Sequence, residues 1–93
     1  MHILLLQVEL YLPECHSLKD KRHVIKPLLN ELRRDFNISA AETDHHDEWQ
    51  HAQIAVVAVG NLREALERTD REVLTLLETH ASAQVSQVHR EWL

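Results

Sequence analysis

The feature that most constrains the fold of this chain is a ten-residue stretch near its start, ILLLQVELYL, from Ile3 to Leu12. Every second residue is apolar, and the residues between them become polar toward the end of the stretch. Such alternation with a period of two predicts a β-strand. One face of this strand is wholly apolar and the other is partly polar, which is typical of a sheet that is covered on one side. Pro13 ends the strand.

A helix is predicted to follow, because apolar residues recur at helical spacing from position 18 to position 36. Ser17 is a good N-cap residue, and Asn37 suits the C-terminal cap. Pro27 lies inside this helix, opposite its apolar stripe. We expect a kink there with the proline facing solvent, and two shorter helices meeting near Lys26 are the alternative.

The remaining elements are two strands, a second helix and a last strand. Residues 38–43 and 50–59 are predicted strands joined by a polar connection, and Gly60 ends the second of them. Asn61 is predicted to cap the second helix, with Glu64 in the capping-box position. Residues 83–92 form a less regular strand, expected at a sheet edge. The buried stripe of the second helix is predicted to comprise Leu62, Leu66, Val73, Leu76 and Leu77.

The order strand, helix, strand, strand, helix, strand predicts the ferredoxin-like arrangement. This is an α+β two-layer sandwich, with two helices on one face of an antiparallel sheet. With 93 residues and a single glycine, the chain forms one domain over residues 1–93. The uncovered face of the sheet is expected to present polar side chains to solvent, to a second copy or to a protein partner: Gln7, Glu9, Tyr11 and Gln53.

The charge of the chain is segregated. Residues 17–36 carry six cations and three acids, whereas the whole chain has a net charge of -5. On a helical wheel four cations form a stripe beside the apolar face: Lys19, Arg22, Lys26 and Arg33. The stripe is interpreted as an anion-binding strip suited to nucleic-acid phosphates. The alternative is a solvated helix flank whose cations pair with acids of the second helix, such as Glu64, Glu67 and Glu72.

The connection ETDHHDEWQH, residues 42–51, is rich in side chains that can ligate metals. The weak metal candidates are His45, His46 and His51, but their spacing matches no closed zinc pattern. We therefore predict a polar hairpin connection without a metal, and a metal-sensing or pH-sensing role is an alternative. Trp49 is expected to pack against the sheet edge or a subunit partner.

The sequence gives little support for catalysis. One glycine cannot build a glycine-rich phosphate loop, and no nucleophile, base and acid form a recognisable set. We predict a non-enzymatic protein with no cofactor and identify no small-molecule substrate. The single cysteine, Cys15, is expected to be inert and favours a reducing compartment. The N-terminal apolar run is too short to cross a membrane and lacks the features of a signal peptide, so a cytoplasmic protein is expected.

Two segments together carry a family resemblance. SLKDKR at residues 17–22 and DEWQ at residues 47–50 resemble the YlxP-like bacterial family, domain of unknown function 503. The likeness extends from the first strand to the second helix. It implies a ferredoxin-like fold, and the family's gene neighbourhood implies an association with RNA or the ribosome. It supplies no catalytic residues. We therefore expect an accessory factor that contacts the backbone of structured RNA or a ribosomal particle, with a homodimeric interaction module as the alternative.

Overall fold

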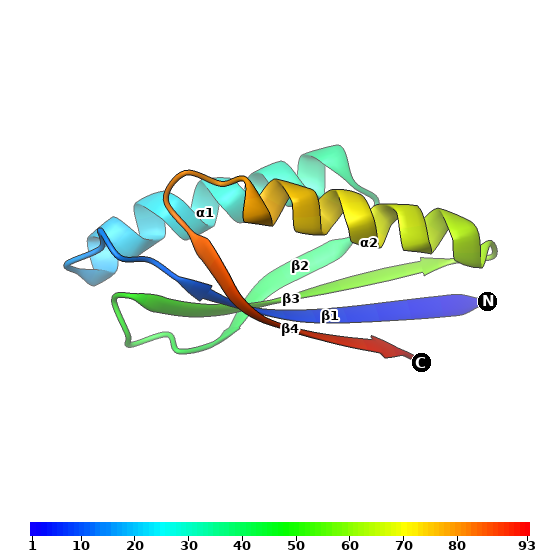
Figure 1. Ribbon diagram of the computed structural model, residues 1–93, viewed down its shortest axis with the longest axis horizontal. Helices are drawn as coiled ribbons and strands as arrows, with labels where there is room; N and C mark the ends of the chain where they lie inside the picture. The colour runs from blue at the N-terminus through cyan, green and yellow to red at the C-terminus, as the bar shows by residue number, and fades with distance from the viewer.

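The computed structural model describes residues 1–93 and contains four strands and two helices. The strands pair in the order β2-β3-β1-β4, and every neighbouring pair is antiparallel. Both helices lie on one face of this sheet (Figure 1). The predicted ferredoxin-like fold is confirmed. The elements are β1 (His2–Tyr11), α1 (Leu18–Asp35), β2 (Ser39–Asp44), β3 (His51–Gly60), α2 (Arg63–Glu78) and β4 (Gln84–Trp92).

The core forms where the apolar face of β1 meets the helices. The alternating residues Leu4, Leu6, Val8 and Leu10 are each at most 1% exposed. They belong to a cluster of 19 buried residues drawn from the helix-facing side of the sheet, from both helices and from the connections at Leu12, Cys15 and Ala83. Burying each such aliphatic side chain contributes roughly 1.5–3 kcal/mol to stability, so the period-two pattern of β1 fixes which face the helices cover.

The start of α1 follows the sequence prediction. Ser17 Oγ accepts a hydrogen bond of 3.0 Å from the backbone N–H of Asp20, and the Asp20 carboxylate accepts one of 2.9 Å from the N–H of His16. Pro27 is exposed, as expected, and α1 is one continuous helix, so the alternative of two shorter helices is wrong. The C-cap is Phe36 and not Asn37, because the chain is already extended at residue 36.

The predicted cap of α2 is also wrong. The N-cap is Leu62, which makes no side-chain hydrogen bond, and its carbonyl accepts hydrogen bonds from the N–H groups of Ala65 and Leu66. Asn61 therefore lies one residue too early to cap the helix. Leu62 is 71% exposed and does not join the buried stripe, because it precedes the first turn of α2. Leu66, Val73 and Leu77 are buried as predicted.

The edge strand β4 is tied to α2 by two contacts between side chains. Arg90 donates hydrogen bonds to both carboxylate oxygens of Asp70, a residue of α2 that is only 8% exposed although it is charged. This contact raises the pKa of Arg90 further above its ordinary value. The guanidinium of Arg63 also lies 4.1 Å from the ring centre of Trp92. No helix in the structure is long and apolar enough to cross a lipid bilayer.

Candidate functional site

The stripe of cations predicted on α1 separates into two kinds of side chain. Lys19, Arg22 and Lys26 are exposed and make no hydrogen bond or ion pair within the protein. Their positive charges are therefore available to a partner. By helix rise alone, Lys19 and Lys26 are about 10 Å apart along the axis.

Arg33, the fourth residue of the stripe, is already engaged. Its Nε and Nη2 donate hydrogen bonds of 3.2 and 2.6 Å to the carbonyl oxygen of Ala40 in β2. Its Nη1 lies 3.4 Å from Asn30 Oδ1. Arg33 thus ties the end of α1 to the sheet edge while keeping its charge at the surface, because neither partner is an anion.

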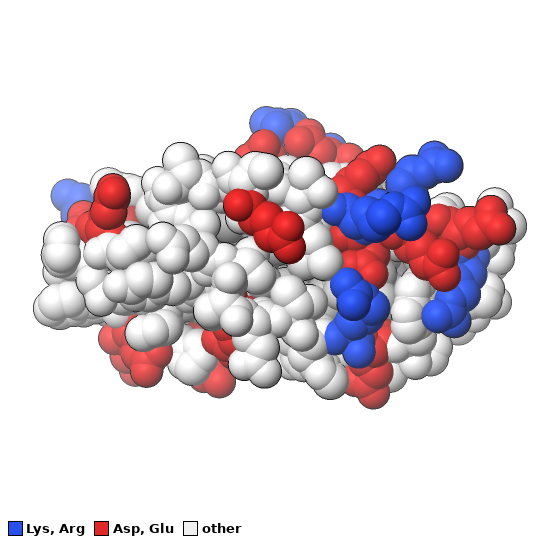
Figure 2. Space-filling view, in the orientation of Figure 1, with Lys and Arg blue, Asp and Glu red and all other residues white.

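The ion pairs with acids of the second helix, which the alternative interpretation predicted, are not formed, and the solvated helix flank stays an alternative. No ion pair joins α1 to α2, and Glu67 pairs instead with Arg63 on its own helix, at 3.2 Å. Figure 2 shows acidic and basic side chains interleaved at the end of this face where α2 begins.

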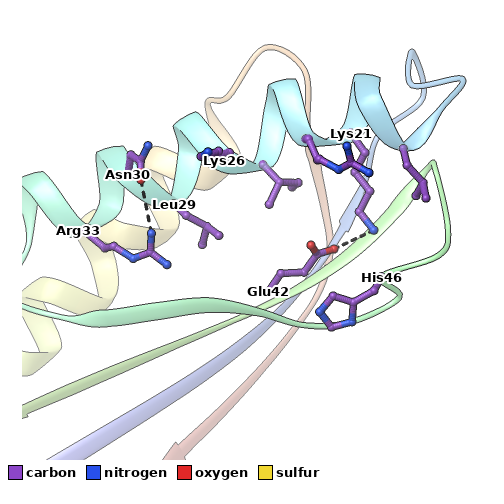
Figure 3. A pocket seen from close by; sticks show the side chains of 10 residues that line it. Lys21, Lys26, Leu29, Asn30, Arg33, Glu42 and His46 are labelled. Carbon is purple, nitrogen blue, oxygen red and sulfur yellow. Dashed lines mark hydrogen bonds and ion pairs between the residues drawn. The ribbon is translucent and has the colours of Figure 1, made fainter.

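A hollow of about 300 Å³ lies between α1 and β2, directly beneath the stripe. Arg22, Lys26 and Arg33 border it, and Leu29 and Arg33 point from α1 toward β2 (Figure 3). This volume is at the lower end of the ~300–1,000 Å³ typical of small-molecule pockets. The lining is completed by the apolar side chains Leu18, Ile25 and Leu29 and by Lys21, Asn30, Glu42 and His46.

Lys21 closes one end of the hollow and is the residue whose role the sequence interpretation missed. It is 3% exposed. Its Nζ lies 2.8 Å from Glu42 Oε2 and donates hydrogen bonds of 2.6 and 2.9 Å to the carbonyl oxygens of His45 and Glu48. Three acceptors match the three N–H donors of an ammonium group. The side chain therefore fastens α1 to β2 and to the turn after it.

The carboxylate of Glu42 is only partly satisfied by this contact. Oε2 is buried and engaged in the ion pair with Lys21 Nζ, whereas Oε1 accepts no hydrogen bond within the protein. Glu42 points from β2 toward α1 (Figure 3). The side chain retains 21% exposure although Oε2 is buried, so Oε1 is the oxygen that can present a hydrogen-bond acceptor to the hollow.

The three histidines of the turn are split between two sides of the sheet. His45 has a left-handed backbone, with φ of 62°, and its ring nitrogens lie 3.0 and 3.1 Å from carboxylate oxygens of Glu9 and Glu48. The ring of His51 is centred 6.4 Å from that of His45, whereas His46 lines the hollow. No three His, Cys, Asp or Glu side chains are arranged to hold a metal ion.

The uncovered sheet face carries the polar residues predicted for it. Gln7, Glu9 and Tyr11 alternate with the buried residues of β1, and Glu9 accepts a hydrogen bond of 2.8 Å from Gln53. Trp49 does not pack tightly, because it is 54% exposed in the turn. The sequence did not single out the opposite end of this face, where β3 exposes Val57 and Val59.

Cys15 lies in the core beside the start of α1. Burial raises the pKa of its thiol, and the carboxylates of Asp20 and Glu14 raise that pKa further. Because the thiolate is the nucleophilic form, these surroundings make Cys15 a poor nucleophile.

Comparison with known proteins places the chain in a sequence family, whereas the fold alone does not. Residues 3–90 match the family model described as "Protein of unknown function (DUF503)". The chain is 28% identical over 86 residues to the uncharacterized protein YlxP of Bacillus subtilis strain 168, covering 92% of this chain and 94% of that protein. A de novo designed protein with ferredoxin fold, solved by NMR, superposes with a TM-score of 0.57 and 12% identity. That alignment covers 99% of this chain and 85% of the designed chain, and it speaks to fold alone.

Proposed function

This chain, which belongs to the DUF503 family of proteins of unknown function, is, we propose, a non-enzymatic accessory factor that binds the phosphate backbone of RNA through the stripe on α1. The observation that carries this proposal is the absence of internal partners for Lys19, Arg22 and Lys26. These three face solvent on a chain that is otherwise acidic.

The contacts favour backbone recognition over direct recognition of base edges by the stripe. Lys and Arg on an exposed helix flank neutralise phosphates, and such contacts position a protein on nucleic acid without carrying sequence information. Arg33 adds fixed positive charge at the end of the stripe, since Ala40 holds its side chain in one place. The whole stripe, from residue 19 to residue 33, extends about 21 Å along the helix axis.

The test is binding to ribosomal RNA and to ribosomal subunits across a salt series. With three phosphate contacts we expect a log–log slope of roughly −2 to −3. The variant Arg22→Glu, Lys26→Glu reverses two of the three unpaired charges and is expected to abolish binding. A slope near zero, or unchanged affinity in this variant, would contradict the proposal.

A matched control separates the stripe from net charge. Arg68→Glu, Arg71→Glu makes the same change in formal charge on the exposed surface of α2. Neither of these two side chains makes a hydrogen bond or ion pair within the protein. The control variant should bind RNA more weakly only through long-range charge, and the difference should vanish near physiological salt because screening acts within about 8 Å there. Equal loss in both variants would show that only net charge matters.

A second candidate function is pairing of two copies through the uncovered sheet face. The observation that favours it is the exposure of Val57 and Val59, at 38% and 55%, on a face that no helix covers. Light scattering at increasing protein concentration tests this. A dimer that becomes a monomer on Val57→Lys supports the idea, and a monomer at all concentrations excludes it.

A further inference from the structure

We propose that the hollow between α1 and β2 is a nucleotide subsite, in which a base lies on the apolar floor while its phosphate meets Arg22 and Lys26. This inference deepens the proposed function and rests on it, because it assigns one nucleotide of the bound RNA to a specific place. It also stands on its own geometry. A free nucleotide has the same chemistry and is a useful probe.

The floor of the hollow suits a flat ring. Ile25 and Leu29 are 4% and 8% exposed, and with Leu18 they present adjacent apolar side chains along one face of α1. The volume of about 300 Å³ fits a single small ring system better than a large ligand. A phosphate alone gains nothing from such a floor, so the apolar part predicts a ligand with an apolar body.

The rim supplies the charge that a nucleotide needs. Arg22 and Lys26 are four residues apart, which places their side chains on the same side of the helix. Neither has a partner within the protein. An anion bound between them would meet two cations above an apolar surface.

The walls supply hydrogen-bonding groups for a base edge. Glu42 Oε2 is buried against Lys21 Nζ at 2.8 Å, whereas Oε1, on the exposed part of the side chain, accepts no hydrogen bond within the protein. Asn30 uses its Oδ1 on Arg33, which leaves its amide N–H groups free, and the ring of His46 makes no hydrogen bond within the protein. Acceptor and donor groups thus line the hollow together. A polar ring edge satisfies both, whereas a purely aliphatic ligand satisfies neither.

The experiment is an NMR titration of the ¹⁵N-labelled protein with GMP, guanosine, ribose 5-phosphate and inorganic phosphate. We expect GMP to shift the amide signals of α1 and of residues 42–46, and to bind at least tenfold more tightly than guanosine or ribose 5-phosphate. Equal affinity for GMP, ribose 5-phosphate and phosphate would overturn the inference, because the base would then contribute nothing.

The variant Leu18→Ser removes part of the floor without altering any charge. Leu18 is the first residue of α1 and is only partly buried, so the change should leave the fold intact. GMP affinity should fall about tenfold, as expected when roughly two buried methylene groups no longer contact the base. Affinity for ribose 5-phosphate should not change. The control Leu62→Ser, at the exposed start of α2, should leave both affinities unchanged.

The two proposals fail in different ways. RNA binding that needs Arg22 and Lys26 but ignores Leu18→Ser, with no shifts from GMP, would retain the RNA function and overturn the subsite. Shifts from GMP in the hollow, together with no RNA binding, would retain the subsite and overturn the RNA function. In that second case the ligand is a free nucleotide.

Discussion

Replacing Lys21 by methionine, a side chain of similar length without the charge, should destabilise the protein by about 3 kcal/mol. The substitution leaves the carboxylate of Glu42 without its cation and removes the donor to the carbonyls of His45 and Glu48. Removing one partner of a buried ion pair typically costs about 3–5 kcal/mol. The lower end applies because Glu42 keeps 21% exposure, so water offsets part of the loss.

This cost is large relative to the total free energy of unfolding. A chain of 93 residues is expected to have a free energy of unfolding of about 5–14 kcal/mol. A loss of 3 kcal/mol should lower the melting temperature by roughly 12–24 °C. In urea, where the denaturant slope is about 1–3 kcal/mol/M for small proteins, the midpoint should fall by about 1–3 M.

Urea unfolding followed by circular dichroism measures this directly, with two comparisons. Lys19→Met removes an exposed cation from the same helix and should change stability by less than about 0.5 kcal/mol. The double variant Lys21→Met, Glu42→Leu removes the unpaired carboxylate as well and should recover the part of the loss that it causes, while the carbonyls of His45 and Glu48 still lack their donor. A cost below about 1 kcal/mol for Lys21→Met, or no recovery in the double variant, would refute the reasoning.

Three further outcomes follow from contacts elsewhere in the structure. Ser17→Ala should cost about 1 kcal/mol in urea unfolding and Ser17→Asp much less, because only the alanine variant loses the bond to the N–H of Asp20; equal stability of both variants would contradict this. Asp70→Asn should cost about 1–2 kcal/mol through its weakened bonds to Arg90, whose partial exposure limits the effect, and thermal melts that match the wild type would count against it. Because the pKa of Cys15 is raised, its thiolate fraction at a given pH is lower in the folded than in the unfolded protein, so alkylation by iodoacetamide should begin at higher pH without urea than with it. Identical pH profiles would be the contrary result.

The period of the apolar residues was sufficient to predict the architecture. The alternation in β1 and the three-to-four spacing in α1 indicate which face of each element is buried, and the order of the six elements then predicts the ferredoxin-like arrangement. The helix boundaries were less predictable at two of the four ends. At Asn61 and Asn37 a good capping residue lies one position outside the observed cap, and only the path of the chain between strand and helix decides which residue is used.

The candidate site was predicted in part. The stripe was visible from the wheel, but its division into unpaired cations and the engaged Arg33 depends on where β2 lies relative to α1. In the sequence, Lys21 is one of six cations in a basic segment. The same wheel places it between Leu28 and Leu32, within the apolar arc, which was a sign that the charge would be buried. Its acceptors are 24 and 27 residues away, so no local pattern could identify them.

The hollow could not be predicted at all, because it is a space between two elements rather than a property of either. Leu29 looked like an ordinary core residue, and Glu42 and His46 looked like parts of a polar connection. They line one cavity only because α1 packs beside β2 in the folded protein.

The edge strand β2 is hydrogen-bonded through its backbone to β3 alone, and two cations from α1 hold its flanks. Arg33 donates hydrogen bonds to the strand at Ala40, and Lys21 donates hydrogen bonds to the turn that follows it. These contacts hold the strand against the helix, and a separation of the two would empty the cavity between them. A ligand seated there would compete with that separation, so amide hydrogen exchange along β2 should slow as the site fills. The protection of a strand that the ligand hardly touches would then serve as a gauge of occupancy.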